Sequence, residues 1–171
     1  MENDEGLRDL NSAAWAHIGE RRFEEAEVAF RQLIDRVGPQ DPLRLWSLFG
    51  TLGSILNSLH RPDEATEMFR QALIEARRVG PSRPEVAAAR YMLGNQFLVY
   101  GDPLDALREV EPIPPGSGHV QCLLHCVAAQ ALWKLARHDE ARMAARSAID
   151  AAPTDERRSY LTQELGHMLK G

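Results

Sequence analysis

Residues 91–110, YMLGNQFLVYGDPLDALREV, contain the pattern that decides the fold. The stretch predicts a helix, a two-residue break and a second helix that begins at Pro103. Gly94 lies on the first of these helices, and Ala106 lies on the second, twelve residues later. The same spacing of two small residues recurs in three further pairs, which are Ala14 and Ala26, Gly53 and Ala65, and Ala129 and Ala141. The sequence therefore predicts four copies of one helix–turn–helix unit.

Small residues at these positions are explained by the way two helices cross within a unit. A close crossing leaves no room for a large side chain, so both helices need glycine or alanine there. One helix pair cannot bury its apolar face alone, but stacked units bury a continuous core between them. Apolar residues for that core recur along the chain at Phe30, Leu33, Phe69, Leu93 and Leu132. The pattern predicts an all-α chain without strands.

Prolines, glycines and helix-capping residues predict the boundaries. The four units are expected at about 7–38, 42–80, 84–111 and 119–153, within one domain that spans residues 1–171. The third unit should have a short second helix, because Pro112, Pro114 and Pro115 cannot continue it. A ninth and last helix, at about 154–169 with Thr154 as its N-cap, is expected to close the array.

These residues resemble the tetratricopeptide repeat (TPR) family. The second unit carries the family pattern most fully, as Phe49-x2-Leu52-Gly53-x2-Leu56 followed by Ala65-x3-Phe69-x2-Ala72. The second-helix alanines of successive units are 39, 41 and 35 residues apart, against about 34 in the usual repeat. Lengthened repeats of this kind are similar to those of kinesin light chains. The resemblance implies a right-handed superhelix of about four repeats plus a C-terminal capping helix.

Composition and charge narrow the classes of function. A net charge of -5 provides no basic surface for nucleic acid or for an anionic membrane. No apolar run approaches ~18 residues, and no basic and apolar leader is present, so neither a membrane span nor secretion is expected. Cys122 and Cys126 are four residues apart on a predicted helix, where a disulfide cannot form. Two reduced cysteines fit a cytoplasmic protein.

The resemblance also implies where a partner would bind. In this family, the first helices of successive units line a concave groove that receives a peptide or a partner helix. Asparagine and glutamine can bond to a peptide backbone in both directions, and tryptophan and tyrosine supply large contact areas. The implied groove residues are Asn11, Trp15, Ser54, Asn57, Tyr91, Asn95, Leu98, Cys126, Gln130, Trp133 and Lys134. We therefore expect a protein–protein interaction module or adaptor that needs no cofactor.

Chemistry other than binding has little support in the sequence. His119, Cys122 and Cys126 share one helical face and form a weak candidate for a metal site. One helix rarely surrounds a tetrahedral ion, so packing of these side chains is the preferred interpretation. The sequence has no Gly-rich phosphate loop, no nucleophile elbow and no metal-binding Glu-His helix motif, so an enzyme is not expected.

Two alternatives to an adaptor stay open. Several chaperones of secreted or aggregation-prone clients are small TPR chains of similar length, and a chaperone is the first alternative. The second is a self-associating structural subunit, such as a homodimer, because Ala145 and Ala148 suggest a loosely filled last unit. The Pro- and Gly-rich segment 111–118 is expected to be a passive connector rather than a lip over the groove.

Overall fold

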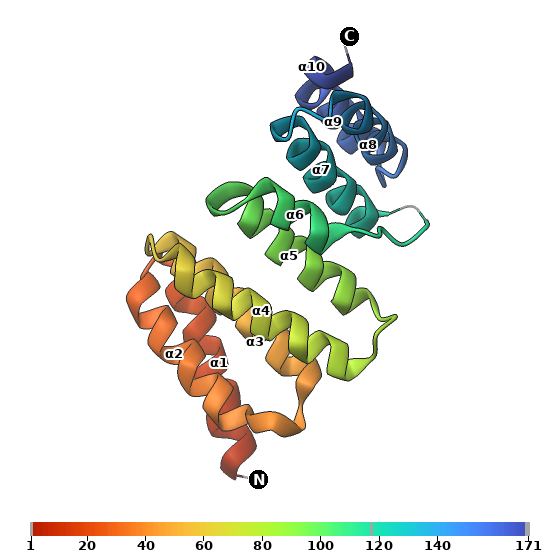
Figure 1. The fold of residues 1–171 in the computed structure, drawn as a ribbon. Coiled ribbons are helices and arrows are strands. Elements are labelled where there is room, and N and C mark those ends of the chain that lie inside the picture. Colours follow the sequence, from red (N-terminus) through yellow and green to blue (C-terminus); the bar gives the residue numbers. More distant parts are fainter. Residues whose placement is uncertain (1, 117, 170–171) are drawn as a thin grey trace. The chain divides into compact units, whose positions relative to one another are not determined.

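The computed structural model describes residues 2–116 and 118–169, and within these residues it contains helices and no strands (Figure 1). The predicted all-α class is therefore confirmed. The chain divides into two compact units, Met1–Ala89 and Arg90–Gly171, and each is described here by itself. None of the helices in the described residues is long and apolar enough to cross a membrane.

The first unit contains two helix pairs. Its elements are α1 (Glu2–Gly19), α2 (Phe23–Val37), the short 3-10 helix η1 (Gly38–Gln40), α3 (Pro42–Ser58) and α4 (Pro62–Val79). Helix α1 packs against α2, α3 packs against α4, and α2 also packs against α3. Consecutive helices are thus neighbours, as expected for stacked helix–turn–helix units.

The second unit contains two more pairs and the C-terminal helices. Its elements are α5 (Pro84–Tyr100), which begins just before the division, α6 (Pro103–Val110), α7 (His119–Lys134), α8 (His138–Asp150), α9 (Asp155–Glu164) and α10 (Gly166–Leu169). Helix α6 packs against α7, α7 against α8, and both α9 and α10 against α8. The predicted short second helix of the third unit is confirmed, because α6 ends after eight residues.

Local sequence signals explain most helix ends. Helices α3, α4, α5 and α6 each begin with a proline. Proline lacks a backbone N–H, and an N–H in the first turn of a helix would have no acceptor within the helix, so its absence there costs nothing. The Asp102 carboxylate accepts a hydrogen bond from the Leu104 N–H at 2.7 Å, and the Thr154 hydroxyl accepts one from the Arg157 N–H at 3.1 Å. The expected N-cap at Thr154 is therefore confirmed.

Two boundaries differ from the sequence-based expectation. Helix α1 begins at Glu2, ahead of the predicted start at residue 7, because the polar first residues carry no apolar periodicity that marks a start. The single closing helix expected at about 154–169 is divided at Leu165 into α9 and α10. Gly166 follows the break and has a low helix propensity. The described residues thus form ten α-helices rather than the nine expected.

The small residues of the repeat lie where the paired helices cross. All six alanines of the pattern are fully buried, and Gly53 and Gly94 are buried as well. A β-carbon built on Gly94 would lie 2.5 Å from Cγ1 of Val110 and 3.6 Å from Cγ1 of Val127. A β-carbon on Gly53 would lie 2.8 Å from the ring of Phe69. The predicted reason for the repeat, close approach of two helices, is confirmed by these distances.

Three of the four turns between paired helices share one backbone geometry. Arg21, His60 and Ala136 each have a φ of 58°, in the left-handed region that favours glycine. In each turn the following residue, an arginine, donates its N–H to a carbonyl five residues earlier, at 2.8 to 2.9 Å. These bonds satisfy carbonyls at the end of the first helix. The turn into α6 differs, since Gly101 lacks a positive φ and Asp102 caps the next helix.

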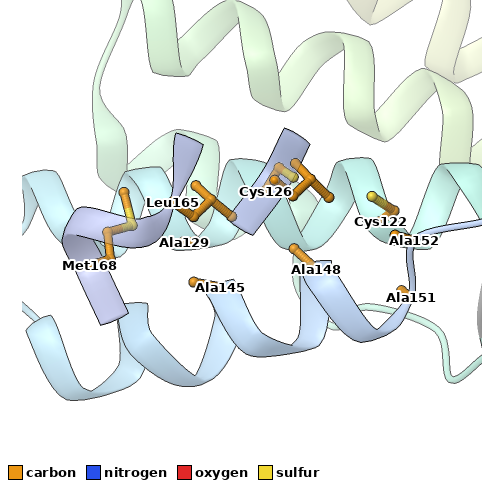
Figure 2. Packing of buried hydrophobic residues seen from close by; sticks show 10 residues of the cluster. Cys122, Cys126, Ala129, Ala145, Ala148, Ala151, Ala152, Leu165 and Met168 are labelled. Atoms are coloured by element: carbon orange, nitrogen blue, oxygen red, sulfur yellow. The ribbon is translucent and has the colours of Figure 1, made fainter. Parts of the chain in front are cut away.

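A core cluster of small and aliphatic residues closes the end of the second unit (Figure 2). Cys122, Cys126 and Ala129 of α7 belong to this cluster together with Leu165 and Met168 of the C-terminal segment. Ala145 and Ala148 of α8 belong to the same cluster and are fully buried. The expectation that these two alanines leave the last unit loosely filled is therefore wrong, because α9 and α10 cover them.

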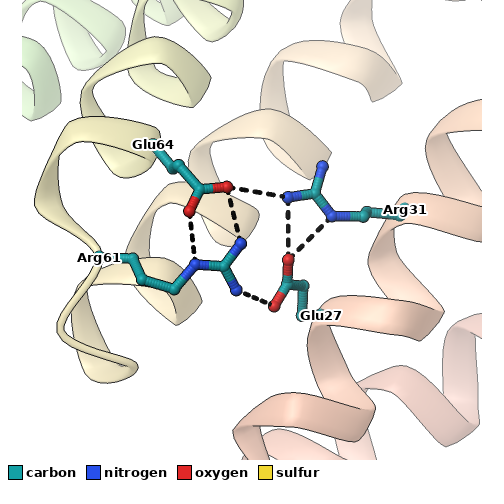
Figure 3. A network of polar contacts seen from close by, with 4 residues as sticks. All are labelled: Glu27, Arg31, Arg61 and Glu64. Carbon is teal, nitrogen blue, oxygen red and sulfur yellow. Dashed lines mark hydrogen bonds and ion pairs between the residues drawn. The ribbon is translucent and has the colours of Figure 1, made fainter.

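Charged side chains connect α2 with the start of α4 in the first unit (Figure 3). The Arg61 guanidinium donates to both carboxylate oxygens of Glu64, at 2.6 and 2.7 Å, and to Glu27 at 2.5 Å. Arg31 donates to Glu27 at 2.9 Å and lies 3.7 Å from Glu64. The hydrogen bonds from Arg61 hold the pKa of Glu64 below its ordinary value of 4.5. This network of Glu27, Arg31, Arg61 and Glu64 joins the first helix pair to the second.

Replacing Gly94 with alanine should destabilise the second unit by about 1–3 kcal/mol, because the new methyl group would overlap Val110 in a filled crossing. Urea unfolding monitored by circular dichroism would measure this loss. The matched control is Gly6→Ala in α1, where a β-carbon would meet nothing within 4 Å. That variant should be neutral or stabilised by up to ~1 kcal/mol. An equal effect in the two variants would disprove the close crossing.

The Cys126 thiol should be unreactive in the folded chain. Its burial, and next the neighbouring Cys122, raise the pKa of this thiol to about 12, so almost no thiolate forms near neutral pH. A disulfide reagent such as dithionitrobenzoate should label neither cysteine until guanidinium unfolds the chain, and both thereafter. Rapid labelling of one thiol in the native protein would contradict the cluster.

The Arg61 network should stabilise the chain in a pH-dependent manner. A carboxylate with a lowered pKa contributes stability above its unfolded pKa, and this contribution is lost as the pH falls through the lowered value. The variant Arg61→Gln should therefore melt below wild type at neutral pH, and the difference should shrink in acid. The control is Arg108→Gln, which removes a single exposed pair with Asp105 at 3.2 Å. A difference in melting temperature that is independent of pH would contradict the prediction.

Candidate partner-binding surface

The predicted groove residues fall into two sets, one in each unit. Asn11 and Trp15 lie on α1, and Ser54 and Asn57 lie on α3. Trp15 is 49% exposed and meets the buried ring of Phe30 edge-on, with centroids 5.5 Å apart. The Ser54 hydroxyl is exposed and donates to the carbonyl of Gly50 within its own helix at 3.2 Å. In the first unit, Trp15 therefore offers the largest exposed contact area of the four.

The second set lies on α5 and α7, whose alignment two contacts define. A β-carbon built on Gly94 of α5 would lie 3.6 Å from Cγ1 of Val127, which places residue 94 beside residue 127. Lys134 donates from Nζ to the carbonyl of Leu98 at 2.7 Å, which places 98 beside 134. Helices α5 and α7, which are the first helices of two successive repeats, therefore run parallel to each other. Asn95 lies between Tyr91 and Leu98 and is consequently level with Gln130.

Not every residue of this set is available at the surface. Leu98 and Cys126 are buried, with 4% and 8% of their surface exposed. Lys134 is committed to the carbonyl at the end of α5. Asn95 is exposed, while Tyr91, Gln130 and Trp133 are half-buried. The exposed part of the predicted groove in this unit is thus narrower than the sequence pattern implied.

The C-terminal helices place polar and aromatic side chains near the predicted residues, although the sequence predicted only a capping role for them. Arg157 of α9 lies with its guanidinium 5.1 Å from the centroid of the Tyr160 ring. The Tyr160 hydroxyl is hydrogen-bonded to Glu164, and this bond raises the pKa of the phenol. Arg157 also lies close enough to Tyr91 to influence its ionisation. The helical spacing of Tyr160, Glu164 and His167 is the signal by which these residues could have been found.

Trp133 forms the centre of an aromatic group at the end of α7. Its indole meets the ring of His138 edge-on at 4.4 Å and that of His167 at 5.3 Å. Beside it is a pocket of about 280 Å³, between α7 and the C-terminal helices. Its lining residues are Gln130, Trp133, Lys134, Glu164, Leu165, His167 and Met168. Three predicted residues and four from the C-terminal helices thus meet in one hollow.

We define the α5–α7–α9 surface by residues of these three helices and of the following α10, which are Tyr91, Asn95, Gln130, Trp133, Arg157, Tyr160, Glu164 and His167 of α10. It combines aromatic faces with amide and charged groups. Nε of Arg157 is buried and has no hydrogen-bond partner among the described residues. A buried donor without a partner costs free energy, and a nearby acceptor relieves that cost.

A second hollow in the same unit was not predicted. It has a volume of about 770 Å³ and lies over α7, between α6 with its following loop and α8. Pro112, Ile113 and Leu132 line it, together with Met143, which is 61% exposed. Arg90 fixes one wall by donating to the carbonyls of Glu109 at 2.8 Å and Pro112 at 3.0 Å. We call this hollow the α6–α8 pocket.

The weak metal candidate of the sequence lies in a different environment from a metal site. Cys122 is fully buried and Cys126 nearly so, among alanines and leucines, whereas His119 is exposed. No group of three metal-binding side chains occurs among residues 2–116 and 118–169.

Comparison with known proteins agrees with the geometry. Residues 124–155 match the family model of the tetratricopeptide repeat, over most of α7 and all of α8. No curated protein matches the chain. Among solved structures it is similar to the crystal structure of BtubC (BKLC) from P. vanneervenii, a kinesin light chain-like protein of TPR type. The TM-score is 0.74 at 18% identity, over 96% of this chain and 72% of that one.

The likeness to BtubC concerns the whole helical arrangement, and the family match concerns the fourth helix–turn–helix unit. Together they support the TPR-like fold that the spacing of small residues indicated. The chain has a TPR-like helical repeat fold, and its fourth helix–turn–helix unit matches the tetratricopeptide repeat model.

Proposed function

We propose that this chain is a protein-interaction module that holds a partner peptide or helix on the α5–α7–α9 surface. TPR folds generally act as non-catalytic scaffolds for other proteins. The observation that supports the proposal is the parallel alignment of α5 and α7, from which Asn95 is expected level with Gln130. Two amide side chains at one level can bond to both the N–H and the C=O of an extended backbone.

The neighbouring side chains suit the remainder of such a ligand. Tyr91 lies half-buried beside the amide pair and offers an aromatic face at a modest cost in side-chain entropy. The pocket beside Trp133, of about 280 Å³, is large enough for one apolar anchor of the partner. Arg157 supplies a positive charge at the edge of this surface. Affinity should therefore come from a few central contacts rather than from total buried area.

The variants Tyr91→Ala and Asn95→Ala test this proposal with a partner first captured from cell extract and then purified. Calorimetry should show binding weakened by about 1–3 kcal/mol in Tyr91→Ala and by a smaller amount in Asn95→Ala. The matched control is Met143→Ala, which removes an exposed side chain from the α6–α8 pocket. Thermal melts of all three variants would show that each is folded.

The same experiment has a contrary outcome. If Met143→Ala loses the partner while Tyr91→Ala and Asn95→Ala bind as wild type does, the partner occupies the α6–α8 pocket. The proposed surface would then be wrong, although the scaffold role of the fold would stand. Trp133→Ala is a poorer test, because Trp133 packs on His138 and His167, and its loss would disturb α10 as well.

A further inference from the structure

The α6–α8 pocket has the size and lining of a site for a small molecule. Its volume of about 770 Å³ lies within the range of roughly 300–1,000 Å³ that small-molecule pockets have. Ala128 and Leu132 of α7 form an apolar floor. Ile113 of the loop after α6 and Met143 of α8 stand on the two walls. The pocket shares no residue with the α5–α7–α9 surface, so the two sites are separate.

The first unit shows which side chains fill this position in another repeat. Residues of α7 and α8 correspond to those 76 positions earlier in α3 and α4, as Ala129 does to Gly53 and Ala141 to Ala65. In this register, four lining residues of the pocket replace larger ones. His125 stands where α3 has Phe49, Ala128 where α3 has Leu52, Ala144 where α4 has Met68, and Ser147 where α4 has Gln71. Shorter side chains on the same helix pair therefore leave space above α7.

The early end of α6 leaves further space. Helix α2 precedes α3 as α6 precedes α7, and in α2 both Phe30 and Leu33 are fully buried. The residues at the same distances from the repeat alanine of α6 are Val110 and Ile113. Val110 is the last residue of α6, and Ile113 is half-buried in the loop. The second unit therefore lacks both a phenylalanine and the last turns of a helix beside the pocket.

The charged residues of the lining already face opposite charges. Arg137 donates to both carboxylate oxygens of Glu140, at 2.7 and 2.6 Å. The pKa of Arg137 is raised by these bonds to Glu140 and, less strongly, by the charge of Glu111. Arg108 lies 3.2 Å from Asp105. A charged ligand would have to break one of these pairs to obtain a partner, so the lining favours an uncharged one.

Two uncharged polar side chains complete the lining. Burial lowers the pKa of the His125 imidazole, so at neutral pH this ring can donate one hydrogen bond and accept another. The Ser147 hydroxyl can also donate and accept. In a pocket of this kind, apolar burial supplies most of the affinity, and one or two polar groups orient the ligand.

We propose that the α6–α8 pocket binds an uncharged small molecule with a largely apolar body and one hydrogen-bonding group. Met143 suits this role, because an exposed and flexible thioether side chain adapts to the shape of a ligand. A partner helix is a poorer occupant, since it is about 10 Å across with its side chains, whereas α6 and α8 both pack directly on α7. The proposal does not depend on the partner surface.

Fluorescence titration with N-phenyl-1-naphthylamine tests the proposal. This dye is uncharged, carries one N–H, and fluoresces more strongly in apolar surroundings. The full chain should bind it at one saturable site. Ala144→Met should weaken binding by at least about tenfold, because it restores the side chain that Met68 provides in α4 and fills the pocket. The matched control is Ala16→Met, the same change at an exposed position of α1, which should bind as wild type does.

Two further comparisons complete the experiment. Met143→Gln keeps the length of an exposed side chain and hence the fold, and it should weaken dye binding several-fold, whereas Tyr91→Ala should leave it unchanged. The dye 8-anilinonaphthalene-1-sulfonate adds one negative charge to the same ring system. Its binding at the pocket, measured as the difference between wild type and Ala144→Met, should be at least about tenfold weaker.

Three results would overturn the proposal. The first is a wild-type chain with no saturable site for the uncharged dye. The second is equal binding by wild type, Met143→Gln and an Ala144→Met variant shown to be folded by its thermal melt. The dye would then occupy another place, such as the hollow of about 420 Å³ between α1 and α2. The third is pocket-dependent binding of the sulfonate as tight as that of the uncharged dye, which would refute the assignment of an uncharged ligand.

Discussion

The close crossing of two helices at a pair of small residues is the constraint on which the rest of this structure depends. At Gly94 the space for a methyl group is already filled by Val110, and at Gly53 by the ring of Phe69. Because each crossing is so tight, larger side chains are displaced toward the neighbouring unit, where they form the core between pairs. The twelve-residue spacing of the small residues therefore marks the points where paired helices cross. These crossings determine which side chains lie at the surface of each helix pair.

Much of the fold could be predicted from the sequence, because prolines, glycines and small residues act locally. Pro62 and Pro103 mark helix starts and the prolines after Glu111 end α6, irrespective of what lies across the core. The break at Leu165 was missed although Gly166 follows it, and the burial of Leu98 depends on tertiary contacts that the spacing does not encode. For the candidate surface, the pattern placed Tyr91, Asn95 and Gln130 on adjacent helices. It omitted Arg157 and Tyr160, because α9 has no place in the repeat motif.

The proline segment after α6 affects more of the second unit than a passive connector would. By ending α6 after eight residues it leaves part of α7 uncovered, and the α6–α8 pocket opens there. Arg90 donates to the carbonyl of Glu109 in α6 and to that of Pro112 in the segment, and these two bonds hold the wall of the pocket in place. The interruption of one helix has therefore created a second concave surface on a scaffold whose regular repeats would have filled it.

The left-handed backbone at Arg21, His60 and Ala136 shows that helix pairing, rather than turn sequence, determines these connections. None of the three residues prefers that conformation, and yet the same geometry appears at each. Contacts at the helix crossings stabilise each helix pair, so the residues of the turns contribute little to specifying the fold. Extra residues inserted there would cost mainly loop-closure entropy, which grows by only about 0.6 kcal/mol for each doubling of length. These turns are natural sites for adding a label or a second domain to the protein.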